Sequence, residues 1–177
     1  LRETQLVVCL LFQYAGMSFV DFAHLKERNI KNGILDYNRQ KTGTPMRLEI
    51  LDTAELMRKE LMGDKKPASG YLFPFLSGTK TGYEAYLEYN AALSRFNRNL
   101  KALKKAAGIA SDVTSYTIRH SFAMALKEQN VPIEMISELL GHKSIKTTQI
   151  YLRSFSLEKM TEVNSTCFGC VYNYVSK

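Results

Sequence analysis

The sequence predicts a mainly α-helical domain with one small antiparallel β-hairpin, an α+β fold. Most of the 177 residues lie in segments whose apolar residues recur at helical spacing, the longest of them covering 86–108. Two short segments, 34–41 and 46–51, are typical of strands, and the turn residues 42–45 between them predict a hairpin. A composition of 45% hydrophobic and 23% charged residues indicates a globular chain that buries a core.

Local signals place the helices around this hairpin. In the first of them, Leu6, Cys9 and Leu10 recur at helical spacing. Ser18, three residues before Asp21, predicts a capping box that starts a short second helix. Helices are expected over 2–14, 19–25, 52–61, 86–108, 116–129, 132–140 and 145–160. The boundary signals are Thr114 or Ser115 and Ser144 as N-caps, Pro132 in a first turn, and Gly141 after a helix end.

The charge of the chain favours a polyanionic partner. The 24 Lys and Arg residues exceed the 17 Asp and Glu residues, which gives a net charge of +7 and a pI near 9.3. Such a balance is most often met in nucleic-acid-binding domains. The tip of the predicted hairpin, with Arg39, Lys41 and Arg47, and the helix over 86–108 carry much of this basic charge.

Other classes are disfavoured. No apolar run is long enough to cross a bilayer, and no signal peptide is visible. Cys9, Cys167 and Cys170 form no disulfide framework, and the pair at 167 and 170 lacks the further ligands of a zinc site, so we expect a cytoplasmic protein without metal or cofactor. Because the chain opens directly in helix without an initiating methionine, we expect it to be a fragment of a longer protein.

Three polar residues lie where an apolar core is expected. Arg119 stands among apolar residues of its helix, three positions after Tyr116, so its charge requires either an internal ion pair or a bound anion such as a phosphate. His142 follows Gly141 and is suited either to capping the helix or to a hydrogen bond with a phosphate oxygen. Tyr151 fits core packing, or a nucleophile if nearby cations stabilise its phenolate.

The order and spacing of these residues resemble the tyrosine recombinase family, the phage and transposon integrases. The similarity rests on the strings R-H-S-F-A, L-L-G-H-K-S-I and T-T-Q-I-Y, and it covers about residues 6–153. The phrase GMSFVDFAHLK followed by Y-x-R-x-KTG resembles the branch found in integrases and invertases of Bacteroides-type mobile elements. The resemblance implies a recombinase catalytic domain over 1–160, without the amino-terminal DNA-clamping domain, and a tail over 161–177 that is either a last strand or a segment docking on another protomer.

The resemblance also implies roles for single residues. Tyr151 corresponds to the nucleophile that attacks a DNA phosphate and forms a 3′-phosphotyrosine. Arg119 and His142 correspond to phosphate ligands, and Lys41 to the lysine that protonates the leaving 5′ oxygen. Tyr116 stands where the family usually has a histidine. A tyrosine can still form a hydrogen bond there, but whether it acts as a general acid or base is left open. No metal is required, because cationic side chains stabilise the charge.

One expected cation is missing. The family's first arginine falls at Ser18 in this alignment, and related branch members carry an arginine at the position of Ala15. Three explanations compete: Arg39 substitutes, the protein is weakened or inactive, or Ala15 is an engineered change. We favour Arg39, because residues two apart on a strand, such as Arg39 and Lys41, face the same way. A DNA-backbone contact or a solvated hairpin charge is its alternative.

Further basic residues are candidate phosphate contacts or ordinary surface charges. They are Lys143, Lys146, Arg153, Arg95, Arg98 and Lys101. Double-stranded DNA is the expected partner, bound by a homo-tetramer on paired sites in the full-length protein and by a monomer of this fragment. The competing interpretations are a DNA-binding domain that has lost catalysis and a type IB topoisomerase, although the short spacing between GHKS and TTQIY fits recombinases better.

Overall fold

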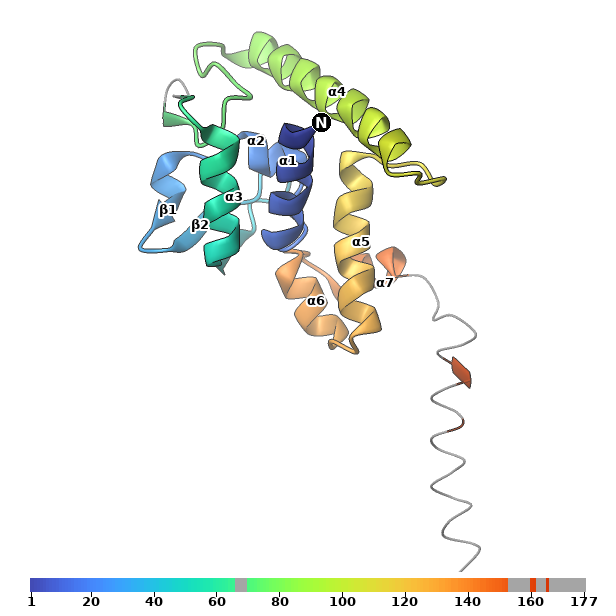
Figure 1. Cartoon of the computed structure of the whole chain (residues 1–177). Helices are drawn as coiled ribbons and strands as arrows, with labels where there is room; N and C mark the ends of the chain where they lie inside the picture. Colours follow the sequence, from blue (N-terminus) through green and yellow to red (C-terminus); the bar gives the residue numbers. More distant parts are fainter. Residues whose placement is uncertain (66–69, 153–159, 162–164, 166–177) are drawn as a thin grey trace, which may run out of the picture.

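The computed structural model describes residues 1–65, 70–152, 160, 161 and 165. This part of the chain is mainly helical and carries one three-stranded antiparallel sheet, so the predicted fold class is confirmed (Figure 1). Its elements, in order, are α1 (Arg2–Gln13), α2 (Phe19–Ala23), the 3-10 helix η1 (Glu27–Asn29), β1 (Ile30–Lys31), β2 (Ile34–Asn38), β3 (Pro45–Glu49), α3 (Asp52–Met62), α4 (Gly82–Ala106), α5 (Ser115–Glu128), α6 (Ile133–Leu139) and α7 (Ile145–Tyr151). No helix of these described residues is long and apolar enough to cross a membrane.

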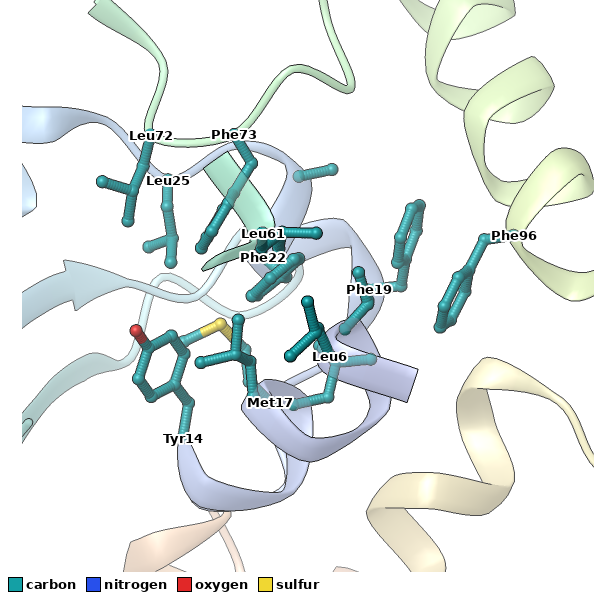
Figure 2. Close-up of a cluster of buried hydrophobic side chains, with 14 of the residues drawn as sticks. Leu6, Tyr14, Met17, Phe19, Phe22, Leu25, Leu61, Leu72, Phe73 and Phe96 are labelled. Carbon is teal, nitrogen blue, oxygen red and sulfur yellow. The ribbon is translucent and has the colours of Figure 1, made fainter. Parts of the chain in front are cut away.

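Helix α1 lies between α3, α4 and α5 and forms the centre of the main core (Figure 1). Its buried face is built from Leu6, Val7, Leu10 and Leu11, whereas Cys9, which the spacing also placed on this face, is exposed. Two aromatic stacks extend the core (Figure 2): Phe19 lies 4.6 Å from Phe96, and Phe22 lies 4.1 Å from Phe73, centroid to centroid. Aromatic pairs of this kind fix α2 against α4 and the loop before it.

Strand β2 ends earlier than the sequence predicted. Its register with β3 pairs Leu35 with Leu48 and Asn38 with Pro45, and β1 adds a short third strand. From Arg39 the chain turns, because the Arg39 carbonyl accepts from Gly43 N–H at 2.8 Å and the Arg39 N–H donates to Thr44 at 2.9 Å. The two-residue alternation of a strand therefore does not extend to Lys41. Arg39 is buried and Lys41 is exposed, so the prediction that they face the same way was wrong.

The carboxyl-terminal helices pack around a second, smaller core. Thr114, one of the two predicted caps, starts α5 by accepting from Thr117 N–H, and Ser144 caps α7 as predicted. The buried residues of this core are Ala123, Ile136 and Leu140. Helix α7 ends at Tyr151 instead of Met160, because Leu152 takes an extended backbone with φ −89° and ψ 116°. The predicted tail, 161–177, lies outside the described residues except for 161 and 165.

Candidate active site

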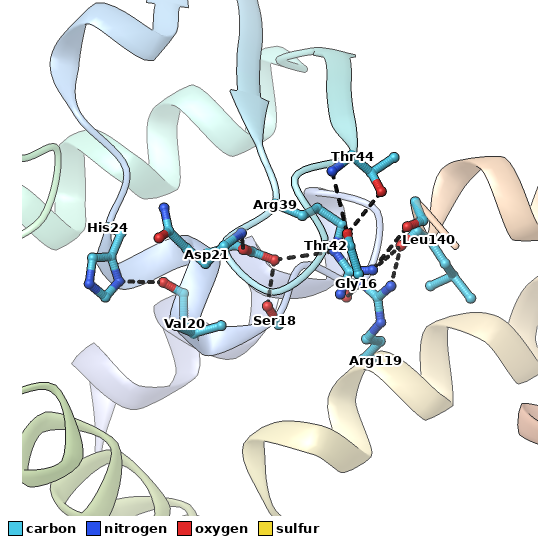
Figure 3. Close-up of polar contacts among 12 residues, drawn as sticks. Gly16, Ser18, Val20, Asp21, His24, Arg39, Thr42, Thr44, Arg119 and Leu140 are labelled. Carbon is cyan, nitrogen blue, oxygen red and sulfur yellow. Dashed lines mark hydrogen bonds and ion pairs between the residues drawn. The ribbon is translucent and has the colours of Figure 1, made fainter. Parts of the chain in front are cut away.

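Arg119 lies inside the molecule and holds three segments together. It projects from α5 with 5% of its surface exposed. Its Nη1 donates to the Gly16 carbonyl at 2.9 Å, and its Nη2 donates to the Leu140 carbonyl at the end of α6 (Figure 3). Hydrogen bonds to carbonyls orient a guanidinium without neutralising its charge. The geometry therefore retains a buried cation at the place where the sequence suggested one.

Arg39 reaches the same point from the hairpin turn. With 8% of its surface exposed, it donates from Nη1 to the carbonyls of Leu140 and Gly141, each at 3.1 Å. Its Nε lies 3.5 Å from the Asp21 carboxylate, which is almost fully buried (Figure 3). Two guanidinium groups from distant parts of the sequence thus converge on one carbonyl oxygen, that of Leu140.

Asp21 anchors this arrangement, and sequence reasoning did not place it in the site. Besides the ion pair with Arg39, its carboxylate accepts from the Ser18 hydroxyl at 2.5 Å and from the Gln40 N–H at 2.7 Å. Ser18 is the N-cap residue that precedes α2, as predicted, but its side chain makes no capping bond to the helix backbone, so the predicted capping box is wrong. The hydroxyl binds the carboxylate instead, because Asp21 faces inward toward the hairpin. The only sequence signal for this role of Asp21 was the basic hairpin turn, because an arginine of that turn that packs against the core needs an anionic partner.

The end of α6 supplies the shared acceptor. Gly141 has φ +61°, its N–H donates to the Glu138 carbonyl at 2.8 Å, and the His142 N–H donates to the Ser137 carbonyl at 2.9 Å. This pairing is the Schellman arrangement that commonly ends helices, and it confirms the predicted role of Gly141. A Cβ at Gly141 would collide with Met46 Sδ and come within 2.8 Å of Arg39 Cδ, so only glycine lets the hairpin approach here.

His142 lies beside both arginines in a neutral form. Its Nδ1 is 2.9 Å from the hydroxyl oxygen of Thr148 on α7. Burial of the ring, followed by the nearby charges of Arg119 and Arg39, lowers the pKa of His142 to about 4. At neutral pH the imidazole is therefore uncharged, so one ring nitrogen can donate a hydrogen bond and the other can accept one, without adding to the positive charge of the guanidinium groups.

Tyr37 is a second site neighbour that the strand pattern did not single out. Its side chain is buried on β2, and burial raises the pKa of the phenol strongly. The charges of Asp21, Arg119 and Arg39 also act on this phenol, which places it next to the same cluster. The sequence signal for Tyr37 was only its alternation as a strand residue.

The structure brings together Arg39, Arg119 and His142 of the predicted catalytic residues. Lys41 is exposed in the hairpin turn, and Tyr116, in the first turn of α5, is 62% exposed. Tyr151 is the last residue of α7, three positions after Thr148, and its side chain lies outside the described part of the chain.

The predicted phosphate contacts lie on two surfaces. The exposed residues Lys143 and Lys146 flank the start of α7, and Arg95, Arg98 and Lys101 are exposed along α4. The remaining candidate, Arg153, lies outside the described residues.

These features define a buried cationic site within a small α-helical domain, and comparisons with known proteins agree. Residues 2–158 match the model of the phage integrase family. A 54-residue segment is 52% identical to the tyrosine recombinase XerD of Lacticaseibacillus casei, covering 30% of this chain and 18% of that protein. A 75-residue segment is 41% identical to the tyrosine recombinase XerC of Rickettsia typhi, covering 42% of this chain and 24% of that protein.

Solved structures share the fold. The Tn1549 transposon integrase in complex with a circular intermediate DNA superposes with a TM-score of 0.64 at 16% identity, covering 90% of this chain and 57% of that one. The XerH recombinase bound to a palindromic difH substrate gives a TM-score of 0.64 at 21% identity, covering 93% of this chain and 45% of that one.

The chain therefore belongs to the phage integrase family, and its fold is that of a tyrosine recombinase catalytic domain. It spans less than a quarter of the length of the curated relatives given above, at 18% and 24%. The finer resemblance to the Bacteroides-type branch stays a prediction.

Proposed function

We propose that this chain is the catalytic domain of a site-specific DNA recombinase that cleaves and rejoins strands through a phosphotyrosine. The observation that carries the proposal is the convergence of Arg39 and Arg119 on the Leu140 carbonyl, beside neutral His142. Paired guanidinium groups match the planar, forked geometry of phosphate oxygens. Held rigidly in a buried place, they stabilise the charge that develops on a phosphate during substitution.

In the proposed reaction the Tyr151 phenolate oxygen attacks the scissile phosphorus. A bond forms between this oxygen and phosphorus, while the bond from phosphorus to the 5′ oxygen breaks. Lys41 gives a proton to that leaving oxygen, and Arg39, Arg119 and His142 bind the non-bridging oxygens. Because the phosphodiester energy is kept in the phosphotyrosine, a 5′-hydroxyl can reverse the step and rejoin the strand without ATP.

Arg39 takes the place of the missing first arginine in this proposal. Ser18, the residue aligned with that arginine, donates to the Asp21 carboxylate, and this carboxylate forms an ion pair with Arg39, whose Nε lies 3.5 Å away. Ala15, the other aligned position, is buried with φ +55° in the turn that follows α1. The Ser18–Asp21 pair thus supports a cation that arrives from the hairpin turn. This placement supports substitution by Arg39 over a solvated hairpin charge.

We further propose double-stranded DNA as the partner, with a tetramer of the full-length protein on two paired sites. The exposed basic residues on α4 and near α7 support DNA binding, since exposed lysines and arginines are suited to contacting successive phosphates. The neighbouring Tn1549 integrase and XerH structures contain DNA. The division into a catalytic domain over 1–160 and a tail over 161–177 stays a prediction.

The deciding experiment traps the covalent intermediate. The full-length parent protein is incubated with nicked duplexes carrying its target site, and a protein–DNA adduct is sought by denaturing electrophoresis. We expect an adduct with the wild-type protein and with Tyr83→Phe, which alters an exposed tyrosine of α4, and none with Tyr151→Phe. An adduct that survives Tyr151→Phe contradicts the assigned nucleophile. DNA binding without any wild-type adduct favours the alternative, a domain that has lost catalysis.

A further inference from the structure

Thr148 is a fully buried polar residue whose hydroxyl meets the imidazole of His142. It has 0% exposure, lies in α7 one helical turn before Tyr151, and its Oγ1 is 2.9 Å from His142 Nδ1. Thr148 belongs to the T-T-Q-I-Y string of the sequence, but no role was predicted for it there. A buried hydroxyl in contact with a phosphate-site imidazole raises the question of which group donates.

The surroundings of Thr148 decide the direction of this bond. Across the described residues, the Thr148 hydroxyl has no second hydrogen-bond partner. If Nδ1–H donated to the hydroxyl, the hydroxyl proton would be buried without an acceptor, which is costly. If the hydroxyl donates to Nδ1, both groups are satisfied. The second arrangement is therefore favoured, and it requires that the neutral imidazole carry its proton on Nε2.

We propose that Thr148 is a positioning residue that fixes His142 as the Nε2–H tautomer, so that the ring donates a hydrogen bond to a non-bridging phosphate oxygen. The phosphate part of this inference rests on the proposed function. Because Thr148 and Tyr151 share α7, the same bond also ties the tyrosine-bearing helix to the imidazole. Because the pKa of His142 is lowered, the ring is neutral near pH 7 and carries a single proton. The position of that proton then decides which ring nitrogen can donate a hydrogen bond.

The tautomer can be measured directly, without any DNA. The chain has three histidines, and ¹⁵N-edited NMR near pH 7.5 distinguishes protonated from unprotonated ring nitrogens. His24 provides an internal reference, because its Nδ1 lies 2.8 Å from the Val20 carbonyl and must carry a proton there. We expect the opposite pattern for His142 in the wild-type protein. Protonation of His142 on Nδ1 overturns the proposal, whether or not any variant folds.

Two substitutions and one matched control extend the test. Thr148→Val keeps the shape but removes the hydroxyl, and we expect it to give a mixture of His142 tautomers. Thr148→Ser keeps the hydroxyl and should retain the wild-type pattern. Thr147→Val, at the exposed neighbouring position on α7, controls for the change of residue type and should leave His142 unaffected. An unchanged His142 spectrum in folded Thr148→Val contradicts the proposal.

Adduct formation on the nicked substrate gives the functional readout. We expect Thr148→Val to lower the rate of adduct formation by about tenfold, which corresponds to the loss of one well-placed hydrogen bond. Thr148→Ser and Thr147→Val should stay near the wild-type rate. A Thr148→Val rate equal to wild type overturns the positioning role. If wild-type protein forms no adduct, the proposed function fails, and the NMR pattern still decides the tautomer.

Discussion

Arg39 and Arg119 donate to the same carbonyl oxygen, that of Leu140, although one comes from the hairpin turn and the other from α5. The acceptor lies at the carboxyl end of α6, where unpaired carbonyls and the helix dipole favour cations. Like charges held this close repel each other unless anionic groups offset them. Asp21 supplies one such group from α2, and a DNA phosphate would supply another.

The first prediction concerns Asp21. Replacing it by Asn leaves a similar shape but removes the charge that faces Arg39 Nε at 3.5 Å. Breaking a buried ion pair by removing one partner costs about 3–5 kcal/mol, so we expect a lower free energy of unfolding, measured by urea denaturation. Asp36→Asn, on the exposed side of β2, should change it by less than about 0.5 kcal/mol. If the two variants have equal free energies of unfolding, the ion pair between Asp21 and Arg39 does not stabilise the fold.

The second prediction separates backbone strain from close packing at Gly141. Gly141 and Gly43 both have positive φ, +61° and +67°, but a Cβ at Gly43 meets nothing within 4 Å, whereas one at Gly141 meets Met46 and Arg39. We expect Gly43→Ala to cost about 1–2 kcal/mol of folding free energy through the left-handed backbone alone. Gly141→Ala should cost about 1–3 kcal/mol more through overpacking.

Thermal and urea unfolding of both glycine variants measure this difference. The wild-type chain and the two variants are compared in the same buffer, and circular dichroism confirms that each is folded before the transition. Matching losses at the two positions are the result that argues against a tight contact between the hairpin and the end of α6.

Some features of this site could be predicted from the sequence because their signals are local. Gly141 after an apolar helix indicates its own left-handed cap, and the spacing around Arg119 indicates a cation on a buried helix face. His142 follows directly from the same helix end. These residues need only a few neighbours in sequence to be interpreted.

Other features depend on chain segments that meet only in the folded molecule. The Asp21 carboxylate was interpreted within its own helix, yet its partners include Gln40 and Arg39 from the hairpin turn. The orientation of Arg39 against Lys41 was predicted wrongly, since strand alternation stops at Asn38. The role of Thr148 depends on a histidine in the preceding loop, so nothing within its own helix could indicate it.

The third prediction concerns acid sensitivity. The pKa of His142 is lowered to about 4 in the folded chain, against 6.5 for an unperturbed histidine. The unfolded chain therefore binds a proton first as the pH falls, so the contribution of His142 to stability is present above about pH 6.5 and is lost progressively toward pH 4. Urea denaturation at a series of pH values should show this loss in the wild-type chain.

His142→Gln removes the titrating ring and should flatten this part of the pH profile. His24→Gln is the matched control, since it alters a histidine that contacts a backbone carbonyl on α2, and it should keep the acid-dependent loss. A His142→Gln profile that still falls by the wild-type amount between pH 6.5 and 4 would show that other groups cause it.

The last prediction concerns the exposed basic residues of α4, a helix that runs along one side of the molecule (Figure 1). If Arg98 and Lys101 contact phosphates, a variant that lacks one of these side chains releases about one counterion fewer when it binds DNA. Arg98→Ala and Lys101→Ala should therefore each reduce the slope of log K against log salt by about 1. Fluorescence anisotropy with a short labelled duplex across a salt series measures the slope. Lys31→Ala removes an equal charge from an exposed position on β1 and should leave the slope unchanged. A slope altered equally by all three variants would indicate a response to net charge instead of contacts along α4.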